Sequence, residues 1–168
     1  VLGVSFNKEV FIMSKAVVFF AEGTEECEAL LVVDLLRRAR VDVTVASASG
    51  NRAITSSHKV HITADALAED IDYSDVDMVV LPGGIPGTPN LAANKTVTDT
   101  CVAFAKAHAG FQDKLAGAEV LDTEVVVDGN ITTSYGLGGA IPFALELVRQ
   151  LAGEAEADRI QKAIAYRH

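Results

Sequence analysis

The residues that could do chemistry gather in two short segments, each of which directly follows an apolar run. The first, AEGTEECE at 21–28, carries four carboxylates and the thiol of Cys27. The second, PGGIPG at 82–87, carries three glycines and no charged side chain. Carboxyl groups serve as general acids and bases, a thiolate serves as a nucleophile, and backbone N–H groups stabilise an oxyanion. The two segments therefore indicate acid–base or thiol chemistry.

Glu28 has two interpretations. If it is buried, it can act as a carboxylic acid that hydrogen-bonds a thiolate. Alternatively, like Glu25 and Glu26, it merely complements the positive end of a helix that starts here. The residues alone favour the second interpretation. For Gly83 and Gly84, an oxyanion-binding turn and a plain turn that needs positive φ are compatible with each other.

The chain has two cysteines, and neither is a strong nucleophile candidate. A helix start would favour the thiolate of Cys27, but Glu26 and Glu28 oppose it. Neighbouring positions on a helix also point in different directions, so Cys27 and Glu28 should not share a site. Cys101 falls on an apolar helical face with Val97, as a small core residue would.

The chain alternates between apolar runs and helical patterns. We expect strands at 16–20, 41–46, 60–64 and 77–81, a hairpin over 124–133, and helices after 25, over 91–107, over 140–151 and over 154–165. Buried strands alternating with helices predict an α/β fold in which helices cover both faces of a mainly parallel sheet. Sites in such sheets form beyond the carboxyl ends of the strands, where segments 21–28 and 82–87 fall.

Composition excludes several classes of function. The net charge is −9 over 168 residues, which disfavours nucleic acid as a partner, and no apolar run reaches membrane-spanning length. The glycines do not form a dinucleotide fingerprint after a strand, so no cofactor is predicted. His58, His61 and His168 lack ligand spacing, so no metal is predicted. The few cysteines favour a reducing, cytoplasmic location. We divide the chain into a leader or extension at 1–12 and one domain at 13–168.

Four segments in the same order resemble the PfpI/ThiJ superfamily, which includes a parkinsonism-associated deglycase. They are KAVVFFAEGTEECEALLVVDLLRRA (15–39), DVDMVVLPGGIPGTPNL (75–91), HAGFQDKLAG (108–117) and VVVDGNITTSYGLGGAIPFALELV (125–148). The first two are fairly specific, through G-x-E-E-x-E and PGG-x-x-G-x-x-N-L. The resemblance implies a flavodoxin-like three-layer sandwich.

The resemblance also implies a site. In the family, a cysteine on a strand-to-helix elbow is the nucleophile, with a glutamate, a backbone N–H of the PGG turn and often a histidine beside it. By motif position the glutamate is Glu28, the glycine is Gly84 and the histidine is His108. The cysteine has no counterpart, because the segment that carries it is missing between Ala107 and His108. A central strand–elbow–helix unit of roughly 30 residues is absent.

Three explanations of the missing unit stay open: a gap in the recorded sequence, a splice or deletion variant, and an elbow supplied by a rearranged or partner segment. The first two fit better, because a sheet that lacks its centre would expose apolar neighbours.

The resemblance implies a cofactor-free glyoxalase or deglycase that acts on methylglyoxal-type dicarbonyls through the missing cysteine. It also implies a homodimer. The alternative is a catalytically inactive chaperone-like, redox-sensing or binding protein of the same fold. In that case the chain is not an enzyme.

Overall fold

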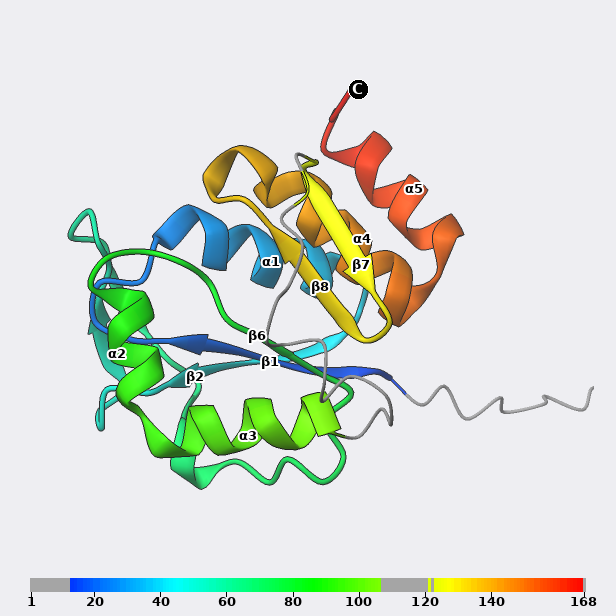
Figure 1. Ribbon diagram of the computed structural model, residues 1–168. Coiled ribbons are helices and arrows are strands. Elements are labelled where there is room, and N and C mark those ends of the chain that lie inside the picture. The colour runs from blue at the N-terminus through cyan, green and yellow to red at the C-terminus, as the bar shows by residue number, and fades with distance from the viewer. Residues whose placement is uncertain (1–12, 107–120, 122, 168) are drawn as a thin grey trace, which may run out of the picture.

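A computed structural model describes residues 13–106, 121 and 123–167. Its centre is a parallel sheet with the strand order β5-β2-β1-β6 (Figure 1). The strands are β1 (Lys15–Phe20), β2 (Asp42–Ser47), β5 (Ala66–Leu67) and β6 (Met78–Val80). Residues 16–20 of β1, and Ala21 directly after it, are almost fully buried, as expected of a strand that is covered on both faces. The predicted α/β class is confirmed.

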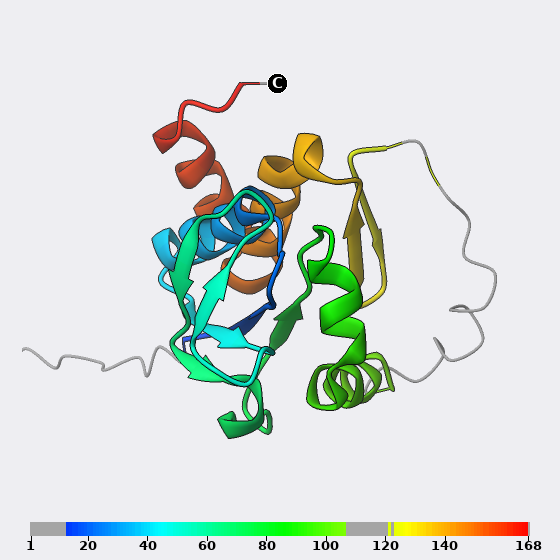
Figure 2. The same ribbon diagram turned by 90° about the vertical axis from the view of Figure 1, so that its left-hand side faces the viewer.

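Helices cover both faces of the sheet (Figures 1 and 2). On one face lie α1 (Glu26–Arg38), α4 (Ala140–Ala152) and α5 (Glu154–Ala163), and on the other lie α2 (Gly87–Ala93) and α3 (Lys95–Lys106). Each face has its own apolar core. The first includes Phe20 and Leu36, and the second includes Phe19 and Val97. These layers are the predicted flavodoxin-like sandwich.

Short elements complete the fold. The antiparallel pairs are β3 (Ala53–Thr55) with β4 (His61–Thr63), and β7 (Val125–Asp128) with β8 (Ile131–Ser134). Two short 3₁₀ helices are η1 (Ala68–Asp70) and η2 (Leu137–Gly139). The second pair confirms the predicted hairpin, but the turn is shifted by one residue: Asp128 pairs with Ile131, and the loop consists of Gly129 and Asn130.

The structure departs from the sequence prediction at one helix and at two short strands. The helix expected over 91–107 is two helices, because Asn94 is extended, with φ −83° and ψ 119°. Its side chain accepts a hydrogen bond from the N–H of Val97 (3.0 Å) and donates one to the carbonyl of Ala48 (3.0 Å). An Asn that caps a helix in this way ends one helix and starts the next, while the apolar residues keep the same helical spacing. The short strands β3 and β5 were not predicted.

Strand β6 ends the sheet in the part of the chain that the structure describes, where it pairs only with β1. Met78 and Val79 are half-buried and Leu81 is 48% exposed, although this run is as apolar as a central strand. An apolar edge strand of this kind fits the predicted loss of a neighbouring strand. Along the described residues, no helix is both long and apolar enough to cross a membrane.

Candidate functional site

The start of α1 fixes the position of Glu28. Glu25 is the N-cap residue, and its Oε2 accepts a hydrogen bond from the backbone N–H of Glu28 at 2.7 Å. Glu28 therefore lies one turn inside the helix, at the end of α1 that follows the carboxyl end of β1. The acidic first turn favours this helix start through the helix dipole.

The turn after β6 contacts the side chain of Glu28. The N–H of Gly83 donates to Glu28 Oε2 at 2.8 Å, and this bond joins positions 55 residues apart in sequence. A β-carbon on residue 83 would lie 2.6 Å from the same oxygen, so the approach requires glycine. The connection from β6 to α2 passes the start of α1 (Figure 1). The structure thus brings the two predicted segments together.

A third segment reaches the other oxygen of this carboxyl group. A β-carbon on Gly136, in the turn after β8, would lie 3.6 Å from Glu28 Oε1. The two oxygens of the half-buried Glu28 therefore face different segments, Oε2 the turn after β6 and Oε1 the turn after β8. That Glu28 acts as an acid or base stays a prediction.

Gly84 has a different structural role from Gly83. Its φ is +106°, and a β-carbon there would collide with the backbone of Gly23 and Glu25. Within the described residues its N–H has no acceptor, so this amide can bind an oxyanion. That Gly84 does so stays a prediction. His108, the third predicted site residue, lies outside the described residues.

Neither cysteine is placed to react beside Glu28. Cys27 is exposed, and partial desolvation together with the charges of Glu25 and Glu26 raises the pKa of its thiol. Cys101 packs with the core on the opposite face of the sheet from α1, and burial raises the pKa of its thiol. A reactive cysteine needs a lowered pKa, so both thiols are poor nucleophiles.

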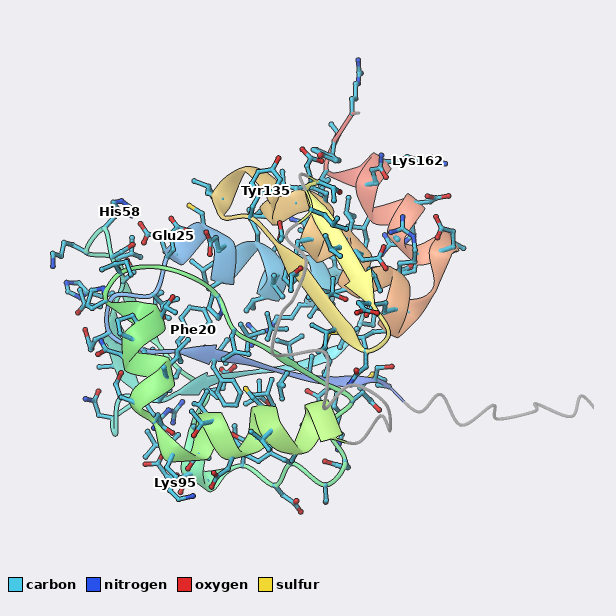
Figure 3. The ribbon with its side chains drawn as sticks, viewed as in Figure 1. Phe20, Glu25, His58, Lys95, Tyr135 and Lys162 are labelled. Carbon is cyan, nitrogen blue, oxygen red and sulfur yellow. The ribbon has the colours of Figure 1, made fainter. Side chains whose placement is uncertain are left out.

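The structure also brings together residues that sequence reasoning kept apart. Nδ1 of His58, in the loop between β3 and β4, lies 3.0 Å from Glu26 Oε1 and 3.9 Å from Glu25 Oε1. His58 and Glu25 lie side by side in Figure 3. Glu26 and His58 are 32 positions apart and show no ligand spacing in the sequence, so only the fold could reveal this cluster.

Comparisons with known proteins identify the family and the fold. The model of the DJ-1/PfpI family matches residues 14–108 and 103–150. Protein dj-1beta of Drosophila melanogaster is 32% identical, over 90% of this chain and 97% of the relative. Protein DJ-1 homolog A of Arabidopsis thaliana is 33% identical over 97% of this chain, which spans only 48% of that relative's length. A glutathione-independent glyoxalase, DJR-1.2 of Caenorhabditis elegans, is 25% identical over 85% of the chain.

The crystal structure of Drosophila melanogaster DJ-1beta superposes with a TM-score of 0.85 at 28% identity, covering 94% of this chain and all of the other. The alignment with the Arabidopsis protein is 193 positions long, against 168 residues in this chain, so at least 25 positions face a gap. The two matched parts of the family model meet at 103–108, where the missing unit was predicted. The chain belongs to the DJ-1/PfpI family.

Proposed function

We propose that the site around Glu28 serves conversion of small dicarbonyls of the methylglyoxal type, and that the sulfur for this reaction comes from a segment that the 168-residue chain lacks. The observation that carries the proposal is the hydrogen bond from Gly83 N–H to Glu28 Oε2, which fixes an acid beside a glycine turn. A relative that is named a glutathione-independent glyoxalase supports this choice of substrate.

The reaction requires no oxidant. A thiolate adds to the aldehyde carbon of methylglyoxal, and the oxygen of that carbon takes a proton to give a hemithioacetal. A hydrogen then moves from this carbon to the neighbouring carbonyl carbon, which gives a thioester of lactate. Water cleaves the carbon–sulfur bond and releases lactate and the thiol. The net change is the addition of one water molecule.

Glu28 would exchange protons with the substrate oxygens in these steps. Oε1 is the oxygen placed for this, since Oε2 accepts from Gly83. The Gly84 N–H would stabilise the oxyanion that forms when the thiolate adds, and His108 would assist the proton transfers. These groups do not replace a nucleophile, so the 168-residue chain by itself should have no turnover.

Restoring the unit tests the role of Glu28. The corresponding segment of a DJ-1/PfpI relative is inserted between Ala107 and His108, and methylglyoxal consumption and lactate release are measured. In that protein Glu28→Gln should lower kcat at least 100-fold, because general acid–base catalysis contributes about 10²–10⁴. The matched control is Asp34→Asn, which changes an exposed carboxylate of the same helix, paired with Arg38, and should keep the activity.

Equal activity in Glu28→Gln and the parent, with both folded by circular dichroism, contradicts the proposal. The protein with the inserted segment is also compared with a version in which the cysteine of that segment is replaced by serine. Methylglyoxal consumption by the first and not by the second supports the assignment of the sulfur to the missing segment.

A second candidate function is binding without catalysis. Apolar side chains flank the Glu28 site on both sides, with Leu81 and Ile85 (79% exposed) by the Gly83 turn and Tyr135 and Leu137 by Gly136. Exposed apolar surface of this kind is typical of binding sites for unfolded chains. The 168-residue protein would then suppress aggregation of a heat-denatured enzyme, and Ile85→Ser would weaken the effect. Undiminished aggregation in the presence of excess protein rules this function out.

A further inference from the structure

Three side chains that can bind a metal converge where the β3–β4 loop contacts the start of α1. The donor atoms of Glu25, Glu26 and His58 all lie within 4.8 Å of one another. The two glutamates are largely buried, with side chains 14% and 11% exposed, whereas the His58 side chain is 71% exposed. Two largely buried carboxylates thus face an exposed imidazole, and Figure 3 shows Glu25 next to His58.

In each carboxylate, one oxygen accepts hydrogen bonds from the protein and the other faces His58. Oε2 of Glu25 accepts from the N–H of Glu28, and Oε2 of Glu26 accepts from Ser57 Oγ (3.2 Å) and the N–H of His58 (3.4 Å). The remaining oxygens, both Oε1, face the same nitrogen, Nδ1 of His58. Outer partners that hold ligands in this way are characteristic of metal centres, where they orient the coordinating atoms.

The spacing suits a small divalent ion. Tetrahedral Zn²⁺ with bonds of about 2.0–2.1 Å holds its ligand atoms about 3.3 Å apart. The two measured separations from His58 Nδ1, 3.0 and 3.9 Å, lie on either side of that value. One imidazole and two carboxylates are a donor set that Zn²⁺ uses, and the exposed side of the cluster leaves room for a water as the fourth ligand.

Electrostatics also permits a cation at this place. The N-terminus of α1 contributes about half a positive charge, which opposes a cation. The two carboxylates contribute two negative charges that are closer to the ion, so the local balance is negative. The hydrogen bonds that Glu26 accepts from Ser57 and from the N–H of His58 do not cancel its negative charge.

We infer that Glu25, Glu26 and His58 form a binding site for a divalent transition ion such as Zn²⁺, separate from the side of Glu28 that faces Gly136. This inference does not depend on the proposed function, because neither a missing segment nor a reaction enters it.

The test is titration of the apo protein with Zn²⁺ by calorimetry, after treatment with a chelator. We expect one Zn²⁺ per chain. His58→Ala should weaken binding at least tenfold, since loss of even an outer partner of a ligand costs 10–100-fold. The matched control is His61→Ala, three residues further in the same hairpin, where the ring contacts Thr55 Oγ1 at 3.4 Å and should leave binding unchanged.

Cobalt separates this site from the nearby thiol. Co²⁺ bound by oxygen and nitrogen lacks the intense near-ultraviolet band that a thiolate ligand gives, and Cys27→Ser should not change the spectrum. No Zn²⁺ binding by the parent protein would show that His58 only hydrogen-bonds Glu26. Equal binding by His58→Ala, or its loss in Cys27→Ser, would also overturn the inference.

Discussion

At the scale of single residues, the candidate site depends on one close approach. Gly83 brings its N–H to Glu28 because it has no side chain, and the same glycine appears in sequence as an ordinary turn residue. The sequence motifs predicted that Glu28 and the PGG turn belong together. They did not show that Gly83, rather than Gly84, hydrogen-bonds the carboxyl group, since both glycines satisfy the motif equally.

The environment of the two thiols predicts their reactivity. Because desolvation raises the pKa of both thiols, most of each thiol is protonated at pH 7. The exposed Cys27 should react slowly with a disulfide reagent, and the half-buried Cys101 should react more slowly still. Cys27→Ser and Cys101→Ser assign the two phases of the absorbance change. A phase faster than that of free cysteine at pH 7 would show an activated thiol and contradict the site as described.

At the scale of elements, the cap of α1 links stability to the site. Glu25 accepts the N–H of Glu28, so Glu25→Ala removes a cap and should lower the free energy of unfolding by about 1 kcal/mol. Urea unfolding followed by circular dichroism measures this, with Asp158→Ala, at an exposed position of α5, as the comparison. Unchanged stability in Glu25→Ala would mean that the cap contributes nothing to holding α1.

The segment between η1 and β6 gives a pH dependence. Burial raises the pKa of Tyr73 to about 12, and its hydroxyl donates to the carbonyl of Ala68 at 2.8 Å. Because the folded protein keeps Tyr73 neutral while the unfolded chain ionises near 10, this contribution is complete below pH 10 and is lost as pH rises towards 12.

Tyr73→Phe should therefore be less stable than the parent at pH 8, by about 1 kcal/mol, and the difference should shrink by pH 11.5. Urea titrations at both pH values measure it, and the exposed Tyr135→Phe serves as the control. A difference that stays constant or grows with pH would show that Tyr73 ionises as easily in the folded protein.

Most elements could be predicted because their signals are local. The apolar run at 16–20, the acidic start of α1 and the glycine between the two strands of the hairpin each specify one structure. The break at Asn94 was missed although its cap bond from the Val97 N–H is local; only the second bond of this side chain, to the distant Ala48, depends on the fold. The approach of His58 to Glu26 depends likewise on how the β3–β4 loop folds back.

At the scale of the whole molecule, the alignment with relatives supports both the family assignment and the absence of one unit. The chain aligns with its relatives at both ends but lacks at least 25 of their positions, and β6 ends the described sheet. The sequence motifs predicted the family and the absent unit, because the motifs on either side of the gap are each complete. They also implied the flavodoxin-like architecture, and the TM-score of 0.85 to a relative shows that the remaining layers keep it.

The explanations of the missing unit predict different masses for the natural protein. Purified from its own source, the protein should have an intact mass well above the 17.7 kDa of the 168 residues if the segment is absent only from the recorded sequence. A mass equal to that value would support a true deletion, and the homodimer expected from the family is checked by light scattering on the same sample.

The central claim is that the chain holds an acid and a glycine turn but not the sulfur that a dicarbonyl reaction needs. Methylglyoxal consumption measured side by side for the 168-residue protein and for the protein with the family segment inserted after Ala107 tests it most directly. We predict no turnover above buffer for the first and lactate release, blocked by a thiol alkylator, for the second. Turnover by the 168-residue protein itself would contradict the account.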